Sequence, residues 1–161
     1  MVQIRRAVPS DIPEIARVWQ AGWLDGHVGN VPDEVVAVRT EAHFLRVSTE
    51  EVDTTLVAVD DDGTVLGVVM VTDEELGQLA VAAEARGRGI GQALVTAAEE
   101  LIATHHDLAE LGVAPGNTTA RRLYERCGWT DRGEVTMPAR PDEPGGLPVP
   151  VVLRHYVKQL R

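Results

Sequence analysis

One short stretch of the sequence decides the fold, and it reads Arg86-Gly87-Arg88-Gly89-Ile90-Gly91. An apolar run that is typical of a strand, residues 76–81, precedes it, and a helix is expected to begin near Gly89. Glycines let backbone N–H groups come close to a ligand, and a helix N-terminus adds the positive end of its dipole. The stretch and its two arginines therefore predict a site for an anion such as a pyrophosphate. Close packing at a strand-to-helix turn is the alternative.

Two familiar phosphate-binding loops do not fit this stretch. The dinucleotide fingerprint G-x-G-x-x-G needs a third glycine where this chain has Gln92. The P-loop pattern needs a lysine after its last glycine, and the only lysine of the chain is Lys158. The anion must therefore belong to a carrier of another kind.

On both sides of this stretch, segments with the periodicity of strands and of helices alternate. The expected strands lie around Ile4 and at residues 55–59, 65–72, 76–81, 110–113, 129–135 and 149–157, with a turn at 60–63 that makes a hairpin of the second and third. The expected helices lie at 11–22 or 11–26, 33–46, 89–104 and 118–127, with loops at 26–32 and 137–148. Asp11 and Glu14 have the spacing of a capping box, and Gly128 closes the last helix. This order predicts an α/β (α+β) fold with a mixed sheet and helices on both faces.

Length and composition indicate one domain, residues 1–161. A hydrophobic fraction of 44% is enough to build a core, which excludes wholesale disorder. The apolar runs are too short for a membrane span, and the first residues lack the apolar segment of a secretory signal. The single cysteine, Cys127, cannot form an internal disulfide. These features predict a cytoplasmic protein, and fourteen arginines against one lysine hint at a bacterial origin.

The charge of the chain is unevenly distributed. The net charge is −10, and residues 47–85 hold ten acidic side chains without a lysine or arginine. A surface of this sign repels nucleic-acid phosphates, so no nucleic-acid partner is expected. No metal site is expected either, because the adjacent His105 and His106 at the end of a helix point about 100° apart.

Three parts of the sequence together resemble a known family. Leu79-Ala80-Val81 followed by Arg86, Gly89 and Gly91 is similar to the acetyl-CoA motif (Q/R-x-x-G-x-G/A) of the GCN5-related N-acetyltransferases, or GNAT family. Residues 117–129, NTTARRLYERCGW, resemble the second motif of that family. The opening residues 4–7, with Asp11 and the helix that carries Trp19, match as well. The resemblance implies a mostly antiparallel sheet of six or seven strands whose fourth and fifth strands splay apart.

The resemblance also implies how the cofactor is held. Residues 86–91 would bind acetyl-CoA, with the pyrophosphate on the backbone N–H groups of Arg88 to Gly91. The pantetheine arm would lie along the backbone of residues 79–81, like an added strand. Asn117 would hydrogen-bond that arm, and Tyr124 would donate a proton to the departing thiolate. Seven residues span nearly two helical turns, so Asn117 and Tyr124 share one face. A buried aromatic in an apolar stripe is the alternative for Tyr124.

The general base is the open point. Family members often use a glutamate early in the fourth strand, and Glu75 would share a face with Leu79 and Val81 if no bulge intervenes. A bulge would exchange Glu75 with Glu74. A solvated turn glutamate is the further alternative, with water taking the proton.

These features predict an enzyme that transfers an acetyl group from acetyl-CoA to a primary amine by direct attack. The acidic segment favours a cationic acceptor such as a polyamine, an amino sugar, or a protein lysine or N-terminus. We expect a monomer or homodimer. The alternative is a non-catalytic acyl-CoA-binding sensor or interaction module, against which the presence of both Asn117 and Tyr124 argues.

Overall fold

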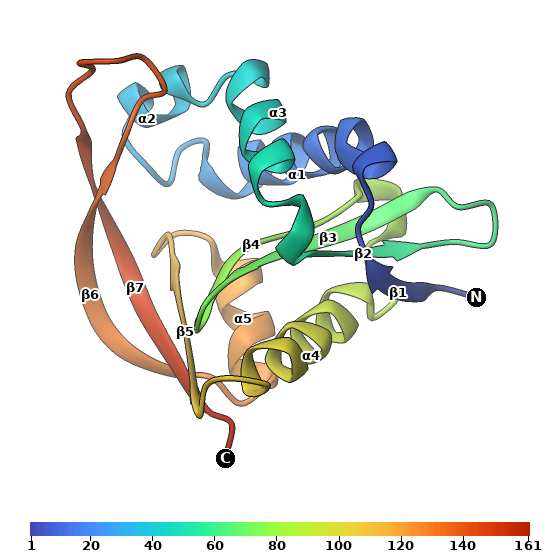
Figure 1. Cartoon of the computed structure of the whole chain (residues 1–161). Coiled ribbons are helices and arrows are strands. Elements are labelled where there is room, and N and C mark those ends of the chain that lie inside the picture. Colours follow the sequence, from blue (N-terminus) through green and yellow to red (C-terminus); the bar gives the residue numbers. More distant parts are fainter.

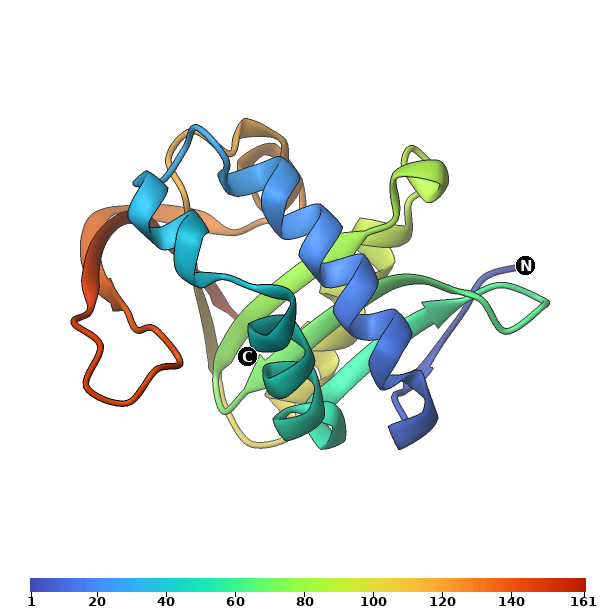
Figure 2. The same cartoon turned by 90° about the horizontal axis from the view of Figure 1, so that it is seen from above.

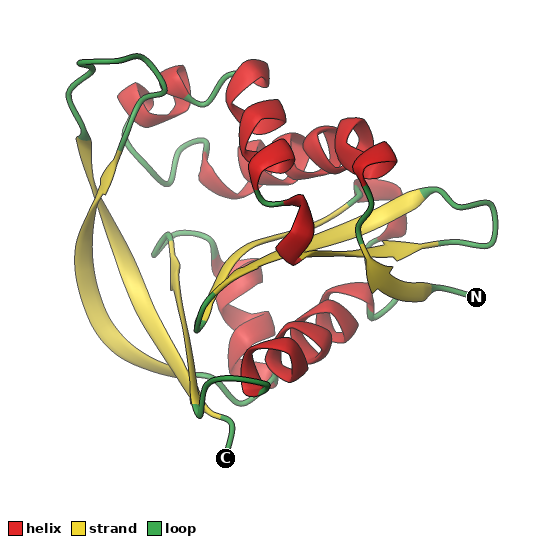
Figure 3. Ribbon diagram, viewed as in Figure 1, coloured by secondary structure: helices red, strands yellow, loops and turns green.

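Seven strands form one continuous sheet in the order β1-β2-β3-β4-β5-β7-β6 in the computed structural model, which describes residues 1–161 (Figures 1 and 3). All neighbouring strands are antiparallel except β4 and β5, which run parallel. The expected mixed, mostly antiparallel sheet is thereby confirmed. The strands are β1 (Gln3–Arg6), β2 (Thr55–Val59), β3 (Val65–Thr72), β4 (Glu75–Val81), β5 (Leu108–Val113), β6 (Thr130–Ala139) and β7 (Val149–Gln159).

Helices cover both faces of the sheet, as expected. They are α1 (Ile12–His27), α2 (Asp33–Val38), α3 (Glu41–Glu50), α4 (Ile90–Ala103) and α5 (Thr118–Arg126). Figure 2 shows α1 lying across one face with α3 beside it, and Figure 1 shows α4 and α5 on the other face. Small residues allow close contact: a side chain at Gly22 of α1 would meet Ala80 of β4 at 2.9 Å, and one at Gly67 of β3 would meet Leu94 of α4 at 2.8 Å.

The sheet opens between β4 and β5. Glu75 and Glu110 are the only residue pair that joins these two strands, at the start of β4. Beyond that point β5 pairs with β7 on its other side, and the two parallel strands diverge (Figure 1). The edge of β4 from Leu76 to Val81 that faces β5 therefore makes no strand pairing. This is the expected splay of strands four and five.

A bulge interrupts β4 at Gly77. Met70 of β3 pairs with Gln78, but Val71 pairs with Leu76, so Gly77 is skipped. Directly paired residues of antiparallel strands share a face, so Glu75 lies on the face of Gln78 and not on that of Leu79. The arrangement expected for an unbulged strand is therefore wrong, because one inserted residue reverses the alternation.

The start of α1 also differs from the prediction. The carboxylate of Asp11 accepts a hydrogen bond from the N–H of Val8 at 2.8 Å and pairs with Arg5 of β1 at 2.8 Å, and it does not cap α1. Glu14 accepts instead from the N–H of Val65 at 3.1 Å. The predicted capping box is wrong because a charged partner on the adjacent strand and a backbone donor on β3 take up the two carboxylates.

Two other predicted segments have different limits. The helix expected at 33–46 is two helices, because Thr40 starts α3 by accepting a hydrogen bond from the N–H of His43 at 3.2 Å. Strand β6 continues to Ala139, past the expected end at Val135, and includes Pro138. Proline is tolerated there because β6 is the edge strand of the sheet. Helix α5 ends as predicted, with Gly128 at φ +90°.

Candidate active site

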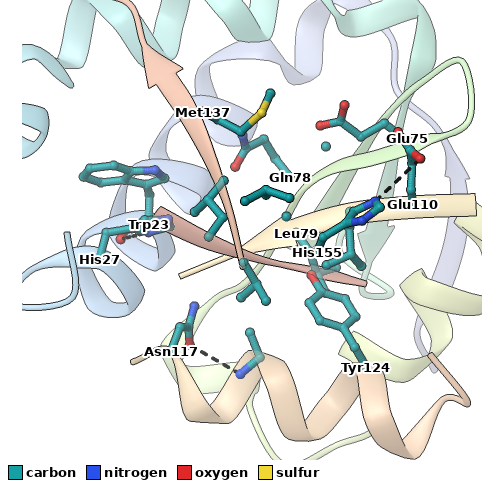
Figure 4. A pocket seen from close by; sticks show the side chains of 17 residues that line it. Trp23, His27, Glu75, Gln78, Leu79, Glu110, Asn117, Tyr124, Met137 and His155 are labelled. Carbon is teal, nitrogen blue, oxygen red and sulfur yellow. Dashed lines mark hydrogen bonds and ion pairs between the residues drawn. The ribbon is translucent and has the colours of Figure 1, made fainter. Parts of the chain in front are cut away.

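A cavity of about 360 Å³ lies where β4 and β5 part. Its walls come from α1, α5 and the strands β4 to β7, and Figure 4 shows their side chains converging on it. Four of the residues singled out by sequence line it, namely Glu75, Leu79, Asn117 and Tyr124. The fold thus brings both halves of the sequence pattern to one place.

The glycine-rich stretch forms the turn into α4. Gly87 and Gly89 have φ of +77° and +78°, a conformation that favours glycine. The backbone N–H groups of the six consecutive residues 87–92 donate to no group of the chain. Of these residues all but Ile90 and Gly91 are exposed, and the stretch lies at the N-terminus of α4. Such a row of free donors is suited to an anion with several oxygen atoms.

The two arginines of this stretch differ in their partners. Arg86 is paired with Asp25 of α1, with Nη2 and Oδ2 2.7 Å apart, and its Nε donates to the carbonyl of Val81 at 3.4 Å. Arg88 is exposed and forms no ion pair. Arg86 thus fastens the turn to α1, and Arg88 is the arginine whose charge is available to a ligand.

The unpaired edge of β4 carries the three residues predicted to hold the pantetheine arm. Leu79 lines the cavity, whereas Ala80 packs under Gly22 of α1. Val81 faces α4, where its side chain lies 3.8 Å from the position of a side chain at Gly91. Backbone groups along this edge are open to an added strand-like ligand.

Asn117 and Tyr124 both line the cavity from α5 (Figure 4), as their seven-residue spacing predicted. Asn117 is also the N-cap of α5, where its Oδ1 accepts from the N–H of Ala120 at 3.3 Å. Tyr124 is only 6% exposed, and its hydroxyl group makes no hydrogen bond within the chain. Burial raises the pKa of Tyr124, with a smaller contribution from Cys127, so the hydroxyl keeps its proton at neutral pH.

Three ionisable side chains gather at one end of the cavity: Glu75, Glu110 and His155 (Figure 4). Burial raises the pKa of Glu75, and the charges of Glu110 and Glu74 raise it further. His155 of β7 lies with its Nε2 3.6 Å from Oε2 of Glu110. Glu74 does not line the cavity. The bulge at Gly77 changes the face of Glu75 but does not exchange it with Glu74.

Two pairs stand out among the lining residues that the sequence prediction did not assign to the site. Glu110 and His155 are 45 positions apart in the sequence, and only the β5–β7 pairing brings them together. Trp23 and His27 sit on one face of α1 at i and i+4, and their rings stack at 4.2 Å with an angle of 6°. The spacing of Trp23 and His27 was the one signal that could have marked a shared wall.

The chain has no group of three or more histidine, cysteine, aspartate or glutamate side chains that could hold a metal ion. None of its helices combines the length and the hydrophobicity that a bilayer span needs.

The parted parallel strands and the glycine-rich anion turn define an α/β protein of the N-acetyltransferase class. The model of the acetyltransferase (GNAT) family matches residues 17–129, and the chain belongs to that family. Its cofactor is therefore acetyl-CoA, and the free N–H groups of residues 87–92 and the open edge of β4 fit that molecule.

Solved structures show the same fold. A GCN5-related N-acetyltransferase from Rhodopseudomonas palustris is 18% identical with a TM-score of 0.75, covering 98% of this chain and 94% of that one. The PaiA N-acetyltransferase of Thermoplasma acidophilum, in complex with coenzyme A, is 17% identical with a TM-score of 0.72 and covers 99% of both chains. YncA of Salmonella typhimurium, a putative acetyltransferase with its cofactor acetyl-CoA, is 17% identical with a TM-score of 0.66. The match covers 100% of this chain and 95% of that one. A search of the curated proteins finds no match for this sequence.

Proposed function

We propose that the protein transfers the acetyl group of acetyl-CoA to a primary amine by direct attack in a ternary complex. The strongest support for this proposal is the pair of ionisable side chains that line the cavity. A carboxylate with a raised pKa, Glu75, and a tyrosine hydroxyl without a partner, Tyr124, open into the same 360 Å³ space at the gap in the sheet. An amine acyl transfer needs one group to accept a proton and another to donate one.

The chain's own groups bind the cofactor at two places. The N–H groups of residues 87–92 hold the pyrophosphate, assisted by the free side chain of Arg88. The open edge of β4 at Leu79 to Val81 pairs with the amide groups of the pantetheine arm. Asn117, besides capping α5, presents its amide to this arm. Acetyl-CoA supplies the acetyl group as an activated thioester.

Glu75 acts as the general base in this proposal. An ammonium group cannot attack, so its nitrogen must first lose a proton. The raised pKa of Glu75 brings this carboxylate closer to the pKa of an amine, which favours the transfer. Glu110 sits opposite Glu75 and adds negative charge that attracts the ammonium form.

Tyr124 acts as the general acid. Its raised pKa keeps the hydroxyl protonated until the thiolate leaves, and it then donates that proton to sulfur. Direct attack is favoured over an acyl-enzyme because the only cysteine, Cys127, does not line the cavity and burial raises the pKa of its thiol.

A lone unpaired cysteine also fits our proposal that the protein is cytoplasmic, and the arginine-rich composition of the chain fits a bacterial origin.

The test is a thiol-release assay with acetyl-CoA and a panel of primary amines, with the products identified by mass spectrometry. We expect free CoA and acetylated amine in equal amounts. Binding of acetyl-CoA by calorimetry without release of CoA for any amine would instead support the sensor or interaction module.

A further inference from the structure

The wall of the cavity opposite β4 divides into an acidic end and an apolar end. Pairing places His155 opposite Gly112, Val135 opposite Leu153 and Met137 opposite Val151. Alternate residues of a strand share a face, so the face of β5-β7-β6 toward the cavity carries, in order, Glu110, His155, Leu153, Val135 and Met137. Going from β5 across β7 to β6, the ionisable side chains therefore precede the apolar ones.

Helix α1 completes the apolar end. Trp23 and His27 line the cavity as a stacked pair, and in Figure 4 they lie on the side away from Glu110 and His155, with Met137 between the two sides. Nδ1 of His27 donates to the carbonyl of Trp23 at 2.8 Å, since a carbonyl can only accept. Burial lowers the pKa of His27, so its ring is neutral and forms part of a flat uncharged wall.

No lining carboxylate at the apolar end could receive a second ammonium group. The only carboxylates among the lining residues are Glu75 and Glu110, both at the acidic end. Arg39 lies near His27 and contributes to lowering its pKa. A polyamine would place its second cation against an apolar wall with no lining carboxylate to compensate its lost hydration, because Asp142, the carboxylate beside Arg39, is already paired with His43 and Arg46.

The tip of the β6–β7 hairpin bridges to α2 and α3 just past Met137. Asp142 pairs with His43 at 2.8 Å and with Arg46 at 2.7 Å, and Arg39 donates to the carbonyl of Arg140 at 2.8 Å. The loop lies beside α2 in Figures 1 and 2. These contacts tie the β6–β7 loop to α2 and α3 at the apolar end of the cavity. Because they leave less open space there, they favour a small acceptor over an extended protein chain.

We propose that the acceptor is a small primary amine with an uncharged apolar or aromatic body, an arylalkylamine in the simplest case. Its ammonium group lies at Glu75 and Glu110, and its body lies against Trp23, Leu153 and Met137. This inference names the acceptor class for the proposed acetyl transfer, and it rests on that proposed function. The apolar end offers no lining carboxylate to a second ammonium group, which selects against polyamines. Its apolar side chains would leave sugar hydroxyl groups unpaired, which selects against amino sugars.

The experiment compares phenethylamine, spermidine, glucosamine and a short lysine peptide by kcat/KM with acetyl-CoA. It is repeated for Met137→Glu, which places a carboxylate at the apolar end on a side chain that is 52% exposed and tolerant of change. Val152→Glu is the matched control, because Val152 is 45% exposed on the opposite face of the same hairpin. The binding of each amine to the protein saturated with CoA is measured by calorimetry.

We expect phenethylamine to exceed the other acceptors by at least about tenfold, as apolar contacts of this size allow. The ratio of kcat/KM for phenethylamine to kcat/KM for spermidine should fall by about tenfold in Met137→Glu and stay unchanged in Val152→Glu. A preference for spermidine, glucosamine or the peptide, or an unchanged ratio in Met137→Glu, overturns the inference. Selective binding of phenethylamine without turnover supports this inference and overturns the proposed function; neither binding nor turnover overturns both.

Discussion

Glu75 of β4 and Glu110 of β5 are register partners, and theirs is the only pairing that joins these two strands. Like charges placed opposite one another in a sheet are destabilising. The arrangement raises the pKa of Glu75 and puts two carboxylates at the mouth of the gap in the sheet. Such a cost in stability is typical of residues that are retained for function.

Replacing Glu75 by Gln is expected to lower kcat by on the order of 10²–10⁴ while leaving the affinity for CoA unchanged. The amide keeps the shape of the side chain but cannot accept the proton of the amine. The loss should be greatest at low pH, where most of the amine in solution is protonated. Glu74→Gln is the control, because Glu74 lies outside the cavity. A larger loss at Glu74 than at Glu75, or no loss at either, would contradict the assignment of the base.

Replacing Glu110 by Gln is expected to shift the pH profile. The charge of Glu110 raises the pKa of Glu75, so its removal lowers that pKa. Glu75 is active when ionised, and kcat/KM is lost as pH falls through its pKa. The acid limb of kcat/KM against pH should therefore move to lower pH in Glu110→Gln. The same amine is used for both proteins, so its own titration is common to them, and coincident limbs would disprove the coupling.

Replacing Tyr124 by Phe is expected to lower kcat by on the order of 10²–10⁴, with little change in the Kd of CoA. Tyr156→Phe provides the contrast. The Tyr156 hydroxyl is fully used, donating to Glu125 at 2.6 Å and accepting from Arg121 at 3.0 Å. Its loss should lower Tm, measured by calorimetry, and leave kcat nearly unchanged. Equal kcat for wild type and Tyr124→Phe would return Tyr124 to a packing role, provided that pre-steady-state kinetics show chemistry to be rate-limiting.

Replacing Gly89 by Glu is expected to weaken CoA binding by at least about tenfold, since a carboxylate at the N-terminus of α4 repels the pyrophosphate. Gly89→Ala is the matched control. Both variants share the strain of a side chain at φ +78°, and a Cβ there meets no atom within 4 Å. Calorimetry should therefore show much weaker binding for Glu than for Ala at similar Tm. Equal affinities in two folded variants would show that the anion binds elsewhere.

Local sequence predicted the parts of the site that lie within one element or one turn. The turn at Gly87 and Gly89 follows from residues that tolerate positive φ, and the shared face of Asn117 and Tyr124 follows from helical geometry alone. These features depend on neighbours only a few residues away.

Features that depend on distant partners were harder to predict. The pairing of Asp11 with Arg5 and of Glu14 with Val65 overrode a local capping signal. The cluster of Glu110 and His155 exists only because β7 inserts between β5 and β6. The bulge at Gly77 is an intermediate case, since an isolated glycine in a strand is a known signal for one.

The most direct test of the account is the parallel measurement of CoA release and acetylated product for the purified protein with acetyl-CoA and phenethylamine. The account predicts one acetylated amine for each CoA released, at a rate far above the hydrolysis of acetyl-CoA without amine, and a collapse of that rate in Tyr124→Phe. Release of CoA at the background rate with every amine, by a protein that binds acetyl-CoA, would contradict it.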